Sequence, residues 1–183
     1  MAHNFTQKGT YDESSLLVGD WSEVYAEPSA GARLRIGNVP EGVLEIGREF
    51  YEHQSTKFPR TTDFIVATRV WMKFTGTVEE IHRKNVSFLL GQTLNPTTSY
   101  TYVGDIDTLT FFTFFGKRTR VSDEVDIIFR MHKCLQRSAF SLGGGDETQG
   151  SPLEVEALDD TDADYGGSST DPLGWIWTPS QGT

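Results

Sequence analysis

Apolar and polar residues alternate along most of this chain, a pattern typical of β-strands with one buried face. The longest such run is 63–76, which at about 3.3 Å per residue spans roughly 40–45 Å, longer than most strands of small domains. The alternation predicts that five apolar side chains share one face: Phe64, Val66, Val70, Met72 and Phe74. The opposite face combines charged residues with Ile65 and Trp71, and we expect it to meet both solvent and a partner.

Shorter runs predict the remaining strands, with turn residues between them. In 43–54, apolar residues alternate with Glu45 and Glu49, so these carboxylates should project away from the core. Asp126 should project in the same way, because the strand over 124–140 is expected to bury its odd-numbered residues: Val125, Ile127, Phe129, Met131 and Leu135. The other predicted strands lie at 33–39, 99–103, within 108–124, at 152–160 and at 173–179.

One segment follows a helical period instead. Thr77 is a candidate N-cap, and Glu80 occupies the position that completes a capping box. Apolar residues then fall near one stripe, and Gly91 suits the left-handed residue that follows a last helical turn. We therefore expect a helix over 78–90 that packs on the sheet, because so short a helix is marginally stable alone in water. Seven or eight strands and one helix predict a mainly β fold, an antiparallel sandwich or barrel with one packed helix.

The composition fits one folded domain preceded by an arm. The 183 residues are 37% hydrophobic and 12% aromatic, which is not the composition of a disordered chain. Residues 1–28 are polar and turn-rich with isolated large apolar side chains and one short candidate strand, so we interpret them as an extended arm that docks on another surface. Residues 29–183 are then a single β domain.

Charge and cysteine content narrow the function classes. A net charge of −10 disfavours a nucleic-acid clamp, which must neutralise phosphates. The single cysteine, Cys134, excludes an internal disulfide framework. The N-terminus lacks the apolar stretch of a secretory signal and no apolar run is long enough to span a bilayer, so we expect neither export by that route nor membrane insertion.

No catalytic constellation emerges from the sequence, and we expect neither an enzyme nor a bound cofactor. His132 and Cys134 alternate on one strand without further ligands nearby, which favours a polar strand face over a metal or catalytic pair. The loop 160–171 carries alternating aspartates, but Tyr165 stands where a calcium loop needs glycine, so a solvated acidic loop is the favoured interpretation. Acidic pairs on strands most simply mark solvent-facing sides: Glu45 with Glu49, and Glu154 with Glu156.

Three segments follow a recognisable order. In FTGTVEEIHRKNVSFLLG (74–91), a long strand leads to a Thr-x-Glu-Glu helix start and an Asn-led apolar stretch that ends in Leu-Gly. In 130–177, a strand containing His-Lys is followed by a Gly/Asp loop, an apolar strand ending in Leu-Asp-Asp, and a closing Pro-Leu-Gly-aromatic strand. Together with RLRIGNVPEG (33–42), these segments resemble the tail tube (major tail) proteins of long-tailed bacteriophages over roughly residues 30–177.

This resemblance implies a structural virion protein, made in the host cytoplasm, whose hexameric rings stack into a tube. Its partners would be further copies of itself, the tail terminator, tape measure and distal tail proteins, and DNA in transit that is not bound specifically. An acidic lumen suits that transit, since a surface that bound phosphates would slow it. The lumen-facing candidates are Glu45, Glu49 and Asp126. The inter-ring candidates are aromatic or basic: Phe5, Tyr11, Trp21, Tyr100, Tyr102, Lys117, Arg118 and Arg120.

Two other interpretations stay open from the sequence. A terminator, neck or baseplate ring protein would share the fold and differ in forming one closed ring. A β-sandwich module that binds a receptor or a carbohydrate would use exposed aromatic residues, for which Trp71, Trp175, Trp177, Tyr100 and Tyr102 are candidates.

Overall fold

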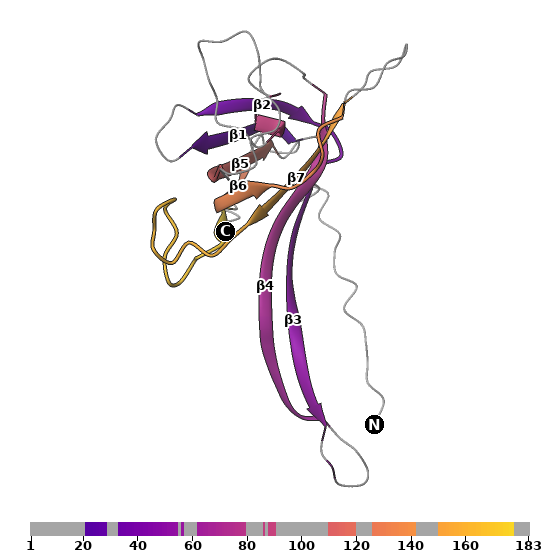
Figure 1. Ribbon diagram of the computed structural model, residues 1–183, viewed down its shortest axis with the longest axis vertical. Coiled ribbons are helices and arrows are strands. Elements are labelled where there is room, and N and C mark those ends of the chain that lie inside the picture. The colour runs from indigo at the N-terminus through magenta and orange to yellow at the C-terminus, as the bar shows by residue number, and fades with distance from the viewer. Residues whose placement is uncertain are drawn as a thin grey trace, which may run out of the picture.

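The computed structural model describes residues 21–28, 33–54, 56, 62–79, 86, 88–90, 110–119, 126–141 and 150–177. They form one antiparallel sheet of eight strands (Figure 1): β1 (Trp21–Pro28), β2 (Leu34–Val39), β3 (Val43–Gln54), β4 (Thr62–Val78), β5 (Phe112–Thr119), β6 (Asp126–Gln136), β7 (Ser151–Ala157) and β8 (Gly174–Trp177). The strand order is β2-β1-β5-β6-β7-β4-β3, and β8 pairs with β6. The mainly β, antiparallel prediction is confirmed. The predicted strand at 99–103 lies outside the described residues.

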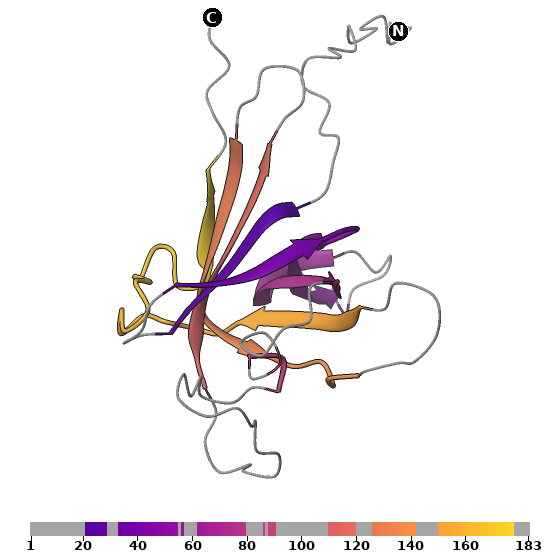
Figure 2. The same ribbon diagram turned by 90° about the horizontal axis from the view of Figure 1, so that it is seen from above.

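The sheet curls so that its two ends approach each other, as the crossing strands in Figure 2 show. β2 lies near one end of the strand order and contacts β4, near the other end. A glycine permits this approach, because a Cβ atom on Gly76 of β4 would lie 2.4 Å from Cγ1 of Val39 on β2. The core lies on the concave side of the curled sheet. A single sheet therefore encloses the core that two packed sheets enclose in a sandwich.

Aromatic rings dominate the core. Trp21, Phe74, Phe114 and Phe129 come from four different strands and pack with ring centroids 4.9–6.0 Å apart. Phe88 adds a ring to this layer from outside the sheet, 4.8 Å from the ring of Phe112. Such pairs add to the stabilisation gained from burial alone.

The assignment of residues 21–28 to an extended arm is wrong, because β1 is an interior strand of the sheet. It pairs with β2 on one side and with β5 on the other. Trp21 is only 7% exposed, and its indole N–H donates a hydrogen bond of 2.7 Å to the Gly42 carbonyl. Trp21 is therefore a core residue, and its assignment as an inter-ring contact is wrong. Residues 1–20 lie outside the described part of the chain.

The predicted helix start at Thr77 is also wrong, because β4 continues through Val78. Thr77 pairs with Pro152 and Val78 pairs with Ser151, so β7 supplies partners that keep this segment extended. Helical conformation is present later, at 86 and 88–89, where the Leu90 N–H donates to the Val86 carbonyl at 3.0 Å. The helix-terminating residue proposed at Gly91 lies outside the described residues.

The longest strands, β3 and β4, form a hairpin that extends away from the core (Figure 1). They pair along almost their whole length, from Val43 opposite Thr75 to Gln54 opposite Thr62. β7 covers only the base of this hairpin, since its pairing with β4 begins at Lys73 and ends at Val78. The distal part of β4 therefore has β3 as its only paired neighbour among the described strands.

A bulge at Thr68 changes which residues share a face of the hairpin. Glu49 lies opposite Arg69, but the next residue, Phe50, lies opposite Ala67. Directly opposite residues share a face of the hairpin. Odd-numbered residues of β4 therefore share the face of Glu49 from Arg69 onward, but they share the face of Phe50 before Thr68. The prediction of one continuous apolar face from Phe64 to Phe74 is therefore wrong, and both faces of the distal hairpin carry apolar side chains.

β6 changes its buried face in a similar way. Phe129 and Met131 are buried as predicted, but Lys133 has a positive φ of 30° and the core positions after it are Cys134 and Gln136. The predicted burial of Leu135 in the same row as Phe129 is wrong. His132 and Cys134, expected to form a polar strand face, are both fully buried, and Cys134 belongs to the core.

Candidate functional site

The distal end of the hairpin exposes large apolar side chains on both faces. Phe50, Tyr51, Phe64, Ile65 and Val66, here called the hairpin tip, are each 41–57% exposed. Val43, Ile46 and Val70 extend this apolar surface toward the base, also with about half of each side chain exposed. Contiguous apolar patches of this kind on a soluble protein usually mark an interaction surface.

Closer to the base, one face of the hairpin is charged instead. Glu45 lies directly opposite Lys73, and Glu49 lies directly opposite Arg69 with 3.9 Å between the charged atoms. Trp71 lies between these pairs across from Gly47, and its indole N–H donates to Glu45 Oε1 at 3.2 Å. Gly47 leaves room for the ring, since a Cβ atom there would lie 2.1 Å from Trp71 Cζ2.

β7 and the end of β6 extend this charged face with acidic and basic partners. Glu154 contacts Lys73 at 2.9 Å, and Glu156 contacts both Arg69, at 3.1 Å, and Arg137. The hydrogen bond to Glu154 raises the pKa of Lys73, and Glu156 raises the pKa of Arg137 in the same way. The charged face, defined as Glu45, Glu49, Arg69, Lys73, Arg137, Glu154 and Glu156, therefore keeps all its cations paired and one carboxylate in excess.

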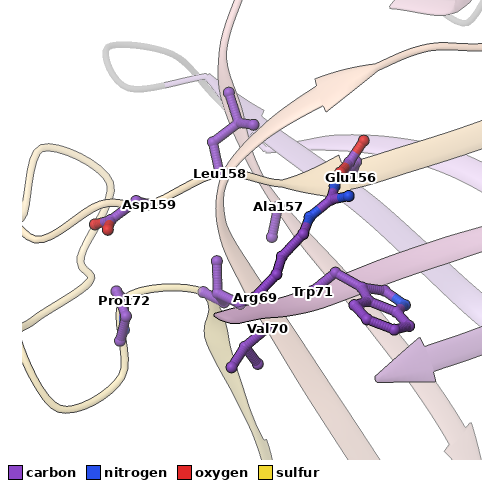
Figure 3. Close-up of a pocket in the computed structure, with 9 residues that line it drawn as sticks. Arg69, Val70, Trp71, Glu156, Ala157, Leu158, Asp159 and Pro172 are labelled. Atoms are coloured by element: carbon purple, nitrogen blue, oxygen red, sulfur yellow. Dashed lines mark hydrogen bonds and ion pairs between the residues drawn. The ribbon is translucent and has the colours of Figure 1, made fainter. Parts of the chain in front are cut away.

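A pocket of about 320 Å³ lies at the hairpin base, beside the charged face (Figure 3). β4 contributes Arg69, Val70 and Trp71, the end of β7 and the following loop contribute 156–159, and Pro172 and Leu173 precede β8. Six of these nine residues are apolar, and Arg69 and Asp159 are the charged residues beside Glu156. We call this hollow the base pocket.

The structure separates the predicted lumen residues into two groups. Glu45 and Glu49 lie together on the charged face, on the side of β3 that the alternation predicted. Asp126 lies at the start of β6, where it forms an ion pair of 3.0 Å with Lys117. This bond raises the pKa of Lys117, with a smaller contribution from Glu23.

The basic residues predicted to form a turn belong to a strand instead. Lys117 and Arg118 lie within β5, where β1 and β6 provide pairing partners. Lys117 bridges Asp126 and Glu23, and the Arg118 guanidinium lies 5.9 Å from the centre of the Trp21 ring. Pairing on both sides of β5 keeps this segment extended, which is the physical reason that a loose basic turn does not form at Lys117 and Arg118. The other inter-ring candidates lie outside the described residues: Phe5, Tyr11, Tyr100, Tyr102 and Arg120.

The acidic loop between β7 and β8 is organised by its own backbone. Asp160 is buried, and one of its carboxylate oxygens accepts the backbone N–H groups of Tyr165, at 3.0 Å, and Gly167, at 2.8 Å. Asp171 accepts a hydrogen bond from the Ser168 hydroxyl. Within the described ranges, no three His, Cys, Asp or Glu side chains are grouped to hold a metal ion.

Sequence inspection missed the base pocket and the partners of the charged face. Leu158 and Pro172 are far from Val70 in the sequence and meet only because β7 pairs with β4. Glu154 and Glu156 carried the pattern of a solvent-facing strand side, but nothing local to them pointed to Arg69 or Lys73. Such a network leaves one signal in the sequence: alternating positions on two strands carry opposite charges. This signal identifies particular ion pairs only once the two strands are known to pair.

No family model matches the chain, and a search of curated proteins gave no match. In the part of the chain that the structure describes, no helix has the length and apolar character needed to cross a membrane.

Proposed function

We propose that this protein is a structural virion protein of a long-tailed bacteriophage, whose hexameric rings stack into the tail tube that delivers DNA to the host. The observation that carries the proposal is the β3–β4 hairpin, which leaves the core and exposes large apolar side chains on both faces. An isolated two-stranded hairpin is at best marginally stable in water. A hairpin of this length therefore needs a neighbouring chain on each face, which a closed ring of identical subunits supplies.

The free strand edges support the same proposal. Within the described chain, the outer edge of β3 has no paired strand, and neither does β4 beyond its contact with β7. Long exposed edges invite pairing with other chains, and a barrel that closes through several subunits removes them. Each subunit would contribute its hairpin to such a wall.

The charged face suits the wall of a channel for DNA. Its cations are held by Glu49, Glu154 and Glu156, so they are not free to bind phosphates, and one negative charge per subunit remains. A weakly negative surface without free lysine or arginine avoids the counterion-releasing contacts that give DNA affinity. Glu45 and Glu49 would face the lumen. Asp126 forms an ion pair with Lys117, so this pair would add no net charge to the lumen wall.

The other proposed partners are tail proteins that meet the ends or the interior of the tube: terminator, distal tail and tape measure proteins. The proposed role is structural and not enzymatic, and it requires no cofactor. The protein would be made in the host cytoplasm and function in the assembled virion.

Assembly of the purified protein tests this proposal. Light scattering over a wide concentration range should show association, and negative-stain microscopy should show rings with six-fold symmetry that stack into tubes. Rings that never stack would favour a terminator, neck or baseplate component. A monomer at every concentration that binds glycans through the exposed β8 residues Trp175 and Trp177 would overturn the tube proposal in favour of a binding module.

A further inference from the structure

We propose that residues 1–20, here called the N-terminal segment, pack along the β3–β4 hairpin of their own chain. They would cover the side opposite the charged face, here called the core-side face, which consists of Ile46, Arg48, Phe50, Glu52, Ile65, Ala67 and Val70. This inference goes beyond the proposed function and changes one part of it. The chain itself would cover the core-side face, whereas neighbouring subunits would cover the opposite face and pair with the free strand edges.

The core-side face continues the hydrophobic core beyond the base of the hairpin. Phe74 and Met72 of β4 are buried in the core, and Ile46 lies directly opposite Met72, so it shares their side of the hairpin. Further along this side, Val70 is 47% exposed and Phe50 is 57% exposed. A row of apolar side chains that begins in the core and ends in solvent is typical of a surface that another segment covers.

The N-terminal segment is joined to the fold beside this face. Trp21, the first residue of β1, donates its indole N–H to the carbonyl of Gly42, the residue before β3. The Trp21 ring also contacts the ring of Phe74, with 5.8 Å between the centroids. Because Phe74 projects from the core side of β4, the N-terminal segment starts at the hairpin base on the same side as the core-side face.

The N-terminal segment is long enough to reach the far end of the hairpin. The 20 residues before β1 span up to about 66 Å when extended. The strand β3, from Val43 to Gln54, spans only about 36 Å. A segment tethered at the hairpin base has an effective concentration on the order of millimolar at its own hairpin. The tether therefore favours the segment of the same chain over that of a second copy.

One side of an extended N-terminal segment carries an ordered set of residue types. Leu17, Glu13 and Tyr11 are all an even number of positions before Trp21, so on an extended chain they share its side. Counted outward from Trp21, an aliphatic, an acidic and an aromatic residue follow one another on this side. At full extension they would lie about 13, 26 and 33 Å from Trp21.

The core-side face of β3 carries a matching set in the same order. Counted outward from Gly42, it presents Ile46, Arg48 and Phe50, at about 13, 20 and 26 Å. Each lies within reach of the leucine, glutamate and tyrosine of the segment, respectively. Arg48 is exposed and forms no ion pair within the described residues, so it is available to the acidic residue. Such complementarity sets the alignment of the segment on the face.

Disulfide cross-linking within one chain tests the inference. A chain with Leu17→Cys and Ile46→Cys is oxidised with copper phenanthroline, which takes up the two electrons as two thiols lose their protons and form one disulfide. The native Cys134 is fully buried, so the introduced thiols dominate the reaction. The matched control carries Leu17→Cys and Glu45→Cys, because Glu45 is exposed one position away on the opposite side of β3.

The rates of intrachain disulfide formation decide the outcome. They are measured on non-reducing gels and by mass spectrometry of the monomer. The pair that includes Ile46→Cys should react at least tenfold faster than the pair that includes Glu45→Cys. Equal rates for the two pairs would overturn the inference.

Mixing single variants separates an intrachain contact from an exchange between copies. A chain with only Leu17→Cys is mixed with an equal amount of a chain with only Ile46→Cys. Mixed dimers should form at less than a tenth of the rate of the intrachain disulfide. Mixed dimers that form as fast would assign the core-side face to the segment of another copy and overturn the inference. Ile46→Cys homodimers as the main product would show that a second hairpin covers the face and would overturn it too.

Exchanging charges tests the alignment at Arg48. Glu13→Arg and Arg48→Glu each place like charges together, whereas the variant with both changes restores opposite charges. Each single change should slow the cross-link between Leu17→Cys and Ile46→Cys about two- to fivefold, the size of an exposed ion pair. The double variant should recover most of the rate. Single effects that simply multiply in the double variant would overturn this alignment.

The wild-type protein distinguishes failure of this inference from failure of the proposed function. Wild-type tubes together with equal rates for the two cysteine pairs would overturn the inference and leave the proposed function in place. A fast intrachain cross-link in a protein that stays monomeric at every concentration would support the inference and overturn the proposed function.

Discussion

Replacing Trp21 tests whether β1 is part of the folded core or part of a dispensable arm. Trp21 contacts the rings of Phe74 and Phe129 with centroid distances of 5.8 and 4.9 Å, and its indole N–H donates to the Gly42 carbonyl. Trp21→Ala removes both the ring packing and the hydrogen bond. Trp21→Phe keeps most of the packing and removes the hydrogen bond alone.

The expected losses in the free energy of unfolding differ accordingly. Truncating a buried aromatic side chain to alanine costs about 3–5 kcal/mol, from lost burial and from the cavity that remains. The hydrogen bond contributes about 1 kcal/mol, so Trp21→Phe should cost roughly 1–2 kcal/mol once the smaller ring is included. Since a domain is stable by only about 5–15 kcal/mol, Trp21→Ala would remove a large share of the total.

Equilibrium urea unfolding at low protein concentration measures these values, with far-ultraviolet circular dichroism as the signal. Trp175→Ala is the matched control, because this tryptophan is 39% exposed on β8 and should cost less than about 1 kcal/mol. If Trp21→Ala were as stable as the Trp175→Ala control, β1 would not contribute to the core and the packing argument would be refuted.

Three further predictions follow from individual contacts. Burial raises the pKa of the Cys134 thiol well above its ordinary value. At pH 8 this thiol should therefore react with a thiol reagent only as the protein unfolds, and fast labelling of the native protein would contradict its burial. Gly47→Ala should displace the Trp71 ring, because the added Cβ atom would lie 2.1 Å from it. The indole N–H resonance of Trp71 should then shift in an NMR spectrum, and an unchanged resonance would argue against that contact. In a phage that carries the protein, the double variant Glu45→Lys, Glu49→Lys should still form tubes but should eject DNA more slowly than the wild type. The difference should be largest at low salt, where phosphate attraction is least screened. Equal ejection rates of variant and wild type at low salt would mean that the charged face does not govern DNA transit.

Local alternation was sufficient to predict most strands and the orientation of the central acidic residues. The bounds of β3 coincide with the predicted 43–54, and Glu45 and Glu49 lie on the face opposite Leu44 and Ile46. This succeeds because successive side chains of a strand point to opposite faces whatever the strand pairs with. The short turn before β3 was predictable locally as well, from the turn residues Pro40 and Gly42, and the Gly42 N–H donates back to the Val39 carbonyl there at 3.4 Å.

Features that depend on pairing were decided only by the tertiary structure. Thr77 carries a helix-capping signal, yet β7 offers it a strand partner, and the long-range ladder prevails over the local preference. The bulge at Thr68 exchanges the faces of β4 through its register with β3, which no count along β4 alone reveals.

The same reasoning separates the residues of the candidate site. The acidic side of β3 is predictable from the sequence of β3 itself, but the partner of Glu49 is Arg69 on β4. Arg69 in turn binds Glu156 on β7, 87 positions further along the chain. Trp21 looked like an isolated anchor in a polar arm, because its partners Phe74 and Phe129 are far away in the sequence. Side-chain direction is a local property of an extended backbone, whereas burial, ion pairing and pocket formation depend on which distant strands become neighbours.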